Sequence, residues 1–365
     1  MRALLLADSD RRRFRSANLA PAPLLVAVAV AILIAVVVGR AEAAEPAPQT
    51  RITEADTGPE LILTRKAVAV FRYRAKGPVA RFQCILDDSE WKSCRRGFTR
   101  RLVDPGPHVF RVRAVAPSGV VDPTPAVRKW EVARWEPNVA AASRFAASRA
   151  GRASFSLDLG WRSWGSDERS RARMASTIKV MLMVAYLNKQ SVRNRALNGT
   201  ERSLISAMIR VSDNNAANWV SFQVGTRRMN ALARRAGMKH FSYSPTWGTS
   251  TTSALDQAGL MYRIERLLPD RHRGFALGLL SRISAYQRWG VAKARPPGWR
   301  LFFKGGWGIS DGRYGGTVNH QIALIRRGRY RIGLAIMTQG NPYTSYGEGT
   351  LKGVARRLLE GLPTP

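Results

Sequence analysis

Residues 212–219 read SDNNAANW, and this stretch lies between two segments of helical periodicity, 201–211 and 215–223. Its first three residues, Ser212-Asp213-Asn214, supply a hydroxyl and an amide close together in the chain. A hydroxyl can relay a proton to a leaving nitrogen, and an amide can hold a substrate carbonyl. Serine, aspartate and asparagine also cap helices well, so the stretch taken alone fits a helix N-terminus equally well.

Upstream, Ser176-Thr177-Ile178-Lys179 stands where a helix is predicted to begin, over residues 177–188. Residues three apart share a helical face, so Lys179 can reach the Ser176 hydroxyl, and the helix N-terminus favours negative charge there. A lysine whose pKa is lowered by burial or by nearby cations can take the serine proton and activate the hydroxyl as a nucleophile. The alternative is an N-cap serine beside a solvated lysine.

Downstream, Lys304-Gly305-Gly306 ends a predicted strand, 300–304. A cation here precedes two residues without side chains, so a substrate can lie against the strand edge and pair with its backbone. Taken alone, the motif also fits an ordinary turn.

The three motifs S-x-x-K, S-D-N and K-G-G, in this order, resemble the signature of class A β-lactamases and penicillin-binding proteins. The resemblance covers about residues 137–361, and SDNNAANW is especially similar to the class A β-lactamase pattern. It implies an acyl-enzyme mechanism, with Ser176 as the nucleophile, Lys179 as its proton acceptor and Ser212 as the relay to the leaving nitrogen.

The same resemblance implies a set of substrate contacts. Asn214 would contact the substrate and the lysine, Lys304 would bind a substrate carboxylate, and Gly306 is expected among the substrate-binding residues. The backbone N–H groups of Ser176 and Trp307 would form the oxyanion hole, where each donor typically contributes about 3 to 4 kcal/mol in the transition state. No cofactor is implied, and the four histidines are scattered singly, which gives a metal site very little support.

Two departures from the family pattern bear on activity. K-G-G replaces the usual K-T-G or K-S-G, so a hydroxyl that often helps to hold the carboxylate is missing. Class A β-lactamases also use a glutamate in an E-x-x-L-N loop to activate the deacylating water, whereas residues 239–254 contain no acid and the next acids, Asp256 and Glu265, fall within a predicted helix. We therefore expect slow hydrolysis or a role on wall peptides rather than proficient β-lactamase activity.

Other patterns suggest competing sites. Residues 308–312 read GISDG and match the G-x-S-x-G elbow of α/β-hydrolases, but a turn-like segment follows where a helix is needed. A Ser-His-Asp triad through His240 or His320 is a second alternative, although His320 lies in an apolar strand and is expected to be structural. Several tryptophans could line a groove for a glycan or simply pack. These are Trp161, Trp164, Trp247, Trp299 and Trp307.

The pattern of residues 136–365 predicts an α+β domain. One early strand, 153–159, precedes a run of helices, and three antiparallel strands come late, so the early strand must join the late sheet. The resemblance implies a β-lactamase/transpeptidase-like fold, with an antiparallel sheet flanked by helices and a helical subdomain. The late strands are 300–304, 318–325 and 330–337, and the helices are 139–149, 177–188, 201–211, 215–223, 227–236, 253–268 and 350–359.

Residues 60–135 predict a β-sandwich, because short alternating segments are separated by turn signals. The stretch from about Cys84 to Val132 resembles the immunoglobulin-like or fibronectin-like modules of bacterial exported proteins, which implies a spacer or a weak adhesion module. Cys84 and Cys94 are the whole cysteine complement. In an exported chain such a pair indicates one disulfide closing a short loop.

The first 45 residues resemble an export signal. Arginines between residues 11 and 15 precede an apolar run, 24–38, which is followed by Ala41-Glu42-Ala43. A cleaved signal and an uncleaved membrane anchor fit equally well. Either way the chain after about residue 45 is expected outside the cytoplasm, secreted or anchored. Residues 46–59 have no periodicity and are predicted to be a linker.

The net charge of +34 arises from 59 Lys and Arg against 25 Asp and Glu. Charge of this size attracts anionic polymers. Export argues against nucleic acid and leaves an anionic wall polymer or the membrane, through the N-terminal segment, as possible partners. Three functions remain open: hydrolysis of β-lactams or related amides, D-alanyl-D-alanine peptidase activity on wall peptides, and wall binding without turnover.

Overall fold

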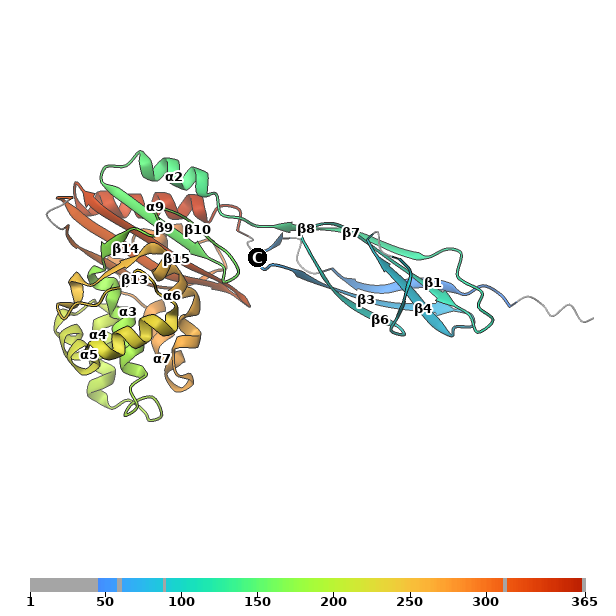
Figure 1. Cartoon of the computed structure of the whole chain (residues 1–365), viewed down its shortest axis with the longest axis horizontal. Helices are drawn as coiled ribbons and strands as arrows, with labels where there is room; N and C mark the ends of the chain where they lie inside the picture. Colours follow the sequence, from blue (N-terminus) through green and yellow to red (C-terminus); the bar gives the residue numbers. More distant parts are fainter. Residues whose placement is uncertain (1–44, 58–60, 88–89, 311–313, 363–365) are drawn as a thin grey trace, which may run out of the picture.

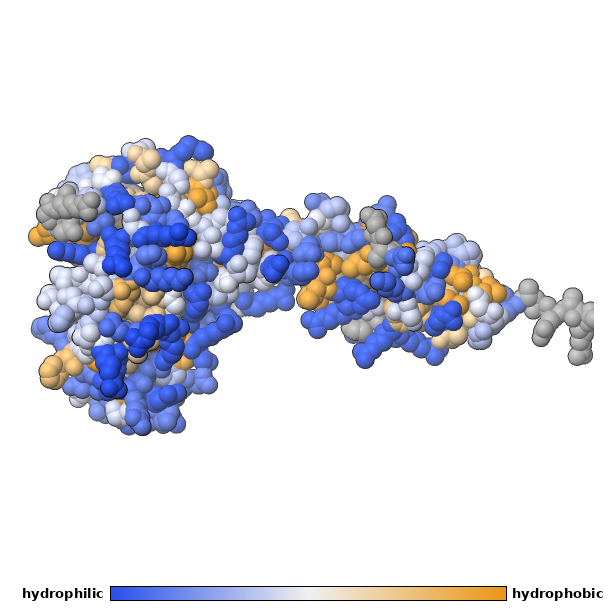
Figure 2. Space-filling model, viewed as in Figure 1, coloured by the Kyte–Doolittle hydropathy of each residue, from blue (hydrophilic) through white to orange (hydrophobic). Residues whose placement is uncertain are grey.

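The computed structural model describes residues 45–57, 61–87, 90–310 and 314–362. Figure 1 shows a β-rich N-terminal part and a second part built from helices around one large sheet. On the face that Figure 2 shows, hydrophilic residues cover most of the second part, whereas hydrophobic residues alternate with hydrophilic ones on the β-rich part. The apolar run at 24–38 lies outside the described residues. Among those that are described, no helix is long and apolar enough to cross a membrane.

Residues 49–134 form two sheets around a common core, and so make a β-sandwich. Phe71 and Phe110, one from each sheet, are buried and stack with their ring centroids 4.0 Å apart. Cys84 and Cys94 form the predicted disulfide. A relationship to immunoglobulin-like modules stays a prediction. The strand orders are β1-β3-β6 and β2-β8-β7-β4-β5, with β1 Gln49–Asp56, β2 Leu61–Ile62, β3 Ala67–Lys76, β4 Arg81–Leu86, β5 Lys92–Cys94, β6 Phe98–Val103, β7 Gly106–Val115 and β8 Ala126–Arg134.

The predicted linker at residues 46–59 is wrong over most of its length. Strand β1 pairs antiparallel with β3 along its whole length, and the backbone N–H of Thr50 donates to Asp122 Oδ2 at 2.6 Å. The strand escaped prediction because it is an edge strand with most of its side chains exposed. Ile52 and Ala55 are the residues of β1 that pack against the sandwich core, which is too few for a clear alternation of apolar and polar residues.

The second part is an α+β domain with a five-stranded antiparallel sheet in the order β10-β9-β15-β14-β13. The early strand β9 pairs with β15, as the sequence predicted. Helices α2 and α9 cover one face of the sheet and α6 packs on the other (Figure 1). The strands are β9 Arg152–Asp158, β10 Ser163–Ser166, β11 Arg171–Arg173, β12 Thr251–Ser253, β13 Arg300–Ile309, β14 Thr317–Arg327 and β15 Tyr330–Asn341.

Helix α3 lies at the centre of the domain, because every residue from Ile178 to Leu187 is buried. Its sequence is apolar on all sides apart from Lys179, as expected for a helix enclosed by others. The helices are α2 Val139–Ala147, α3 Ile178–Leu187, α4 Gly199–Arg210, α5 Asn214–Ala236, α6 Ala254–Leu267, α7 Asp270–Ser281, α8 Val291–Ala294 and α9 Thr344–Leu358, with short 3-10 turns η1 Ala175–Thr177, η2 Trp247–Thr249 and η3 Ala285–Gln287.

Helix α5 joins what the sequence predicted as two helices, 215–223 and 227–236. A kink at Gly225, with φ 67° and ψ 168°, separates them. The positive φ is strained for residues with a side chain, so the glycine permits the bend.

Candidate active site

The backbones of the first and third motifs pack directly against each other. An ideal Cβ on Gly306 would lie 2.9 Å from Thr177 N and 3.0 Å from Ser176 N. Strand β13 therefore packs directly on the η1 turn that carries Ser176, and a residue with a side chain at position 306 would push the two apart. The second glycine of the motif is explained by this close approach.

The backbone around Ser176 is held in an uncommon conformation. Ala175, the residue before it, has a φ of 46°, which is rare for a residue with a side chain. The segment is fixed from outside: Met174 N donates to Ser250 O at 2.8 Å, and His320 Nε2 lies 2.8 Å from Arg173 O. Strain of this kind persists where surrounding contacts enforce it and is common at active sites. Ser176 is partly buried and lies just before the N-terminus of α3.

Lys179 is fully buried and makes three hydrogen bonds. Its Nζ donates to Ser212 O at 2.6 Å, to Asn214 Oδ1 at 2.7 Å and to Ser212 Oγ at 3.2 Å. Burial lowers the pKa of Lys179 to about 8, although the nearby charge of Asp213 acts in the opposite direction. Among the described residues none of these hydrogen bonds goes to Ser176, because the ammonium group is directed at the second motif, and proton transfer from Ser176 to Lys179 stays a prediction.

Ser212 connects the two buried lysines. Its Oγ accepts from Lys179 Nζ at 3.2 Å and from Lys304 Nζ at 3.1 Å. Its φ of 63° again places a residue with a side chain in the left-handed region. A hydroxyl between two ammonium groups can pass a proton in one direction while it receives one from the other.

Lys304 is also fully buried, and its described hydrogen-bond partners are all neutral. Besides Ser212, its Nζ donates to Gly305 O at 2.7 Å and to Gln287 Oε1 at 3.3 Å. Burial and the charge of Lys179 hold the pKa of Lys304 well below its usual value. A buried cation without a carboxylate among these partners is suited to receive an anionic group from a ligand.

Gln287 is a site residue that the sequence analysis missed. Its Nε2 donates to Arg210 O at 3.1 Å, which fixes the amide so that Oε1 faces Lys304. It lies in the short η3 turn, far along the chain from the S-D-N motif, and belongs to no motif that could have marked it.

Aromatic rings line the two lysines. The ring of Trp247 lies 4.8 Å from Lys179 Nζ, and its indole N–H donates to Asn218 Oδ1 at 2.8 Å. The ring of Trp307 lies 5.5 Å from Lys304 Nζ. Trp289, which the sequence analysis did not single out, packs edge-on against Trp307 with the ring centroids 6.1 Å apart. These contacts are cation–π and aromatic packing interactions that shield the ammonium groups from water.

The other three tryptophans that the sequence analysis named pack within the fold. Trp299 is 1% exposed and lies in the core of the α+β domain. Trp161 and Trp164 contact each other edge-on, with ring centroids 5.6 Å apart, and pack against the same core.

The candidate acids lie in structural roles. Asp213 caps α5 by accepting from Ala216 N at 2.7 Å. Asp256 accepts from the backbone N–H groups of Lys239 and His240, and Glu265 pairs with Arg326 and Arg331. Among the described residues no carboxylate is hydrogen bonded to Ser176 or Lys179.

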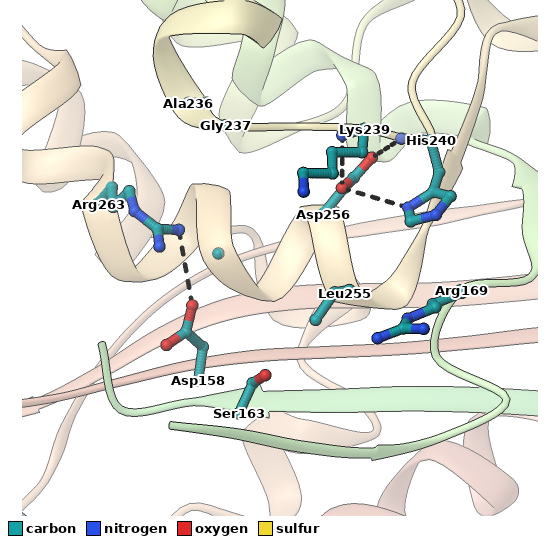
Figure 3. A pocket seen from close by; sticks show the side chains of 11 residues that line it. Asp158, Ser163, Arg169, Ala236, Gly237, Lys239, His240, Leu255, Asp256 and Arg263 are labelled. Carbon is teal, nitrogen blue, oxygen red and sulfur yellow. Dashed lines mark hydrogen bonds and ion pairs between the residues drawn. The ribbon is translucent and has the colours of Figure 1, made fainter. Parts of the chain in front are cut away.

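The alternative triad through His240 does not have the required geometry. Figure 3 shows His240 and Asp256 on the wall of a hollow of about 430 Å³. Ser253 Oγ and Asp256 Oδ1 both approach the same ring nitrogen, Nδ1, at 3.3 and 3.6 Å, whereas a triad needs the serine and the acid on opposite nitrogens. Ser253 is also fully buried and caps α6.

His320 is structural, as predicted. It is fully buried, accepts from Thr338 N through Nδ1 at 3.2 Å and contacts Arg173 O through Nε2. Burial lowers its pKa to about 4. Ser310, the serine of the G-x-S-x-G match, follows β13, and the next element among the described residues is strand β14 and not the helix that an elbow needs.

Residues 197–362 match the model of the β-lactamase enzyme family. The α+β domain is similar to this family over most of its length. The enzyme is accordingly a serine hydrolase that acts on amide bonds. The match begins after Ser176 and Lys179, whose place in the site rests on the contacts described above. No curated protein matches the sequence.

Solved structures show the same fold for this hydrolase domain. A β-lactamase from Sphaerobacter thermophilus is 20% identical, with a TM-score of 0.51, and the match covers 62% of this chain and 98% of that one. A class A β-lactamase from Mycobacterium abscessus is 20% identical, with a TM-score of 0.50 and coverage of 61% and 98%. A protein named PBP-A is 20% identical, with a TM-score of 0.50 and coverage of 60% and 93%.

Proposed function

We propose that the protein is an exported serine hydrolase that forms an acyl-enzyme at Ser176 with β-lactams or with related amides of wall peptides, and releases the acyl group slowly. The observation that carries the proposal is the position of Ser212 Oγ between the ammonium groups of Lys179 and Lys304. This arrangement links a candidate base, a proton relay and an anion-binding cation within one site.

Acylation would begin with transfer of the Ser176 proton to neutral Lys179. With a pKa of about 8, roughly a tenth of the lysine is neutral at pH 7. The serine oxygen attacks the amide carbon, and the negative charge that develops on the carbonyl oxygen is stabilised by the N–H groups of Ser176 and Trp307. The carbon–nitrogen bond then breaks. Ser212 gives its proton to the leaving nitrogen and is reprotonated by Lys179, which returns the proton that it accepted.

The substrate would be oriented by its carboxylate. Lys304 offers a buried ammonium group with neutral neighbours among the described residues, and a carboxylate that reaches it forms a charge-assisted hydrogen bond in a site of low dielectric constant. Asn214 would hold the acyl-side carbonyl through its amide group. β-Lactams and the C-terminal ends of wall peptides both carry a carboxylate beside the amide that is cleaved.

Slow release follows from the same geometry. Hydrolysis of the acyl-enzyme needs a water molecule and a group that takes its proton. Among the described residues no carboxylate is hydrogen bonded to Ser176 or Lys179, and the face of Lys179 toward η2 is covered by the ring of Trp247. The site therefore provides the groups needed to form the acyl-enzyme, but provides fewer of those needed to hydrolyse it.

A D-alanyl-D-alanine peptidase that acts in wall synthesis is the second candidate. The likeness in fold to PBP-A favours it, and so does the absence of the loop glutamate. In either case the β-sandwich would be an immunoglobulin-like spacer that holds the hydrolase domain away from the point of attachment or secretion. Wall binding without turnover is the remaining alternative.

The test is the intact mass of the purified protein over time with a penicillin. We expect a penicilloyl adduct that forms on the wild type and is absent from Ser176→Ala and Lys179→Ala. Ser310→Ala is the matched control, because it removes the serine of the rival elbow, and it should acylate normally. An adduct on Ser176→Ala, or its loss in Ser310→Ala, would overturn the assignment of the nucleophile.

The substrate class is resolved by a second assay. Release of D-alanine from a peptide ending in D-alanyl-D-alanine, lost in Ser176→Ala, would identify the peptidase. Steady hydrolysis of the penicillin without release of D-alanine would identify a β-lactamase. If no adduct forms with either compound, wall binding without turnover becomes the better proposal.

A further inference from the structure

A second hollow, of about 530 Å³, lies where α6 ends and α7 begins. Arginine side chains dominate its wall, and Asp270 is the one acid among its described lining residues. The arginines are Arg193, Arg235, Arg266, Arg271 and Arg273. They come from three segments: the turn after α3, the last turn of α5 and the α6–α7 junction. The concentration of charge is therefore a product of the fold.

Two of these arginines are held in place by backbone carbonyls. Arg235 Nη2 donates to Leu267 O at 2.6 Å, and its Nη1 and Nη2 both reach Asn188 Oδ1 at 3.2 Å. Arg273 Nε donates to Glu265 O at 2.7 Å, and its Nη2 pairs with Asp270. The carbonyls of Glu265 and Leu267 belong to the C-terminal end of α6, where cations are favoured. These two guanidinium groups are fixed before any ligand arrives.

The side chains of the other three arginines are not held in place in this way. Arg193, Arg266 and Arg271 are exposed, and within the described part of the chain their side chains have no hydrogen bond or ion pair. Elsewhere in the same domain arginines are paired with acids, as Arg195 is with Glu201. Several like charges around one hollow repel one another, and an anion bound between them would remove that repulsion.

We propose that this hollow binds a phosphate-bearing anion, at a site separate from the one that contains Ser176. Guanidinium groups form bidentate hydrogen bonds with phosphate oxygens, and arginine is favoured over lysine where such recognition is needed. Two fixed arginines would position a phosphate and the three free ones would close on it. The chemistry is shared by phosphodiester polymers of the wall, anionic lipid head groups and small phosphorylated molecules.

The main difficulty for a test is that a chain with a net charge of +34 attracts polyanions everywhere. The design therefore compares two variants of the full chain with the same change in charge. One carries Arg193→Gln, Arg266→Gln and Arg271→Gln in the hollow. The other carries three exposed sandwich arginines changed in the same way, Arg51→Gln, Arg81→Gln and Arg100→Gln.

The measurement is calorimetric titration with inorganic tripolyphosphate at about 0.15 M salt, where exposed charges separated by more than about 8 Å are largely screened. We expect the hollow variant to bind at least tenfold more weakly than the wild type and the sandwich variant to change by less than about twofold. Equal weakening in both variants, or no binding by the wild type, would overturn the proposal. Circular dichroism and acylation by penicillin should be unchanged in both variants, which excludes misfolding and separates this site from the active site.

The source of the phosphate is determined by repeating the comparison with two further probes. These are a poly(glycerol phosphate) polymer and vesicles that contain phosphatidylglycerol. If only the hollow variant loses affinity for the polymer, the partner is a wall polymer. If only the hollow variant loses affinity for the vesicles, the partner is a membrane. A response to tripolyphosphate alone indicates a small phosphorylated ligand.

Discussion

The ring of Trp289 occupies the space that a side chain at position 305 would need. An ideal Cβ on Gly305 would lie 2.9 Å from Cη2 and 3.0 Å from Cζ2 of Trp289. The K-G-G motif therefore depends on an aromatic ring that is remote in sequence. Where the related pattern has a hydroxyl, this site has an indole that packs edge-on against Trp307.

This relationship predicts that the two positions are coupled. Gly305→Thr alone should lower the acylation rate by about tenfold or more, because overpacking against Trp289 costs about 1 to 3 kcal/mol. The double variant Gly305→Thr with Trp289→Ala should recover much of that loss, with a coupling energy of about 0.5 to 3 kcal/mol. Second-order acylation constants of the wild type, the two single variants and the double variant measure it.

A matched control is Gly274→Thr, since a Cβ at that position would meet no described atom within 4 Å. It should leave acylation unchanged. Additive effects at positions 305 and 289 would contradict the interpretation that the ring has replaced the hydroxyl.

The pKa of Lys179 predicts the pH dependence of acylation. The lysine acts as a base in its neutral form, and burial lowers its pKa to about 8. The rate should therefore rise about tenfold per pH unit below pH 8 and level off above it. Pre-steady-state acylation with a chromogenic β-lactam between pH 6 and 9.5 measures this. A rate that is flat across that range would mean that Lys179 is not the proton acceptor.

Trp247 is predicted to control the lifetime of the acyl-enzyme. Its ring lies 4.8 Å from Lys179 Nζ and is anchored to Asn218. Trp247→Ala should admit water to this face of Lys179, because the space left beside polar groups can hold ordered molecules. We expect the adduct to decay several-fold faster, measured by intact mass after removal of excess penicillin.

Two controls separate this effect from a general loss of structure. Trp247→Phe keeps a ring over Lys179 and should keep a long-lived adduct, although it loses the hydrogen bond to Asn218. Trp164→Ala removes a tryptophan that packs elsewhere and should not alter the lifetime. An adduct on Trp247→Ala that lasts as long as on the wild type would show that the ring does not limit access of water.

The sequence indicated which residues come together, but not how they contact one another. The three motifs marked Ser176, Lys179, Ser212 and Lys304 as candidates through their spacing along the chain, and the structure brings the three motifs together. The motifs could not show that Lys179 points at Ser212, since that depends on how α3 packs against the start of α5. The residues around the motifs, including Trp289, belong to no local pattern and are brought in by tertiary packing alone.

The same distinction holds for the fold. Buried strands such as β14 and β15 have continuous apolar runs and were predicted near their observed positions. Strand β1 was missed because its mostly exposed side chains carry little periodicity. It pairs with β3 through backbone hydrogen bonds, and the residue types of an edge strand give little indication of such pairing.

Stability at low pH should depend on Glu201. This carboxylate is 5% exposed and accepts from Arg195 Nη1 and Nη2 at 2.7 Å each, and from Asn198 N at 2.8 Å. The pKa of Glu201 is lowered to about 2, chiefly by the hydrogen bonds from Arg195, whereas burial acts in the opposite direction. Because the folded state binds this proton less tightly than the unfolded state does, the stabilisation is complete above about pH 4.5 and is lost as the pH falls toward 2.

Glu201→Gln should therefore lower the free energy of unfolding at pH 7 by about 1.5 to 3 kcal/mol, the range for hydrogen bonds to charged groups. The difference from the wild type should shrink as the pH falls from 4.5 to 2, because the wild-type carboxylate is then protonated as well. Urea unfolding at a series of pH values measures both effects. Glu136→Gln is the matched control, since its pair with Arg162 is exposed and should contribute less than about 1 kcal/mol. A Glu201→Gln deficit that stays constant down to pH 2 would show that the loss is one of packing and not of charge.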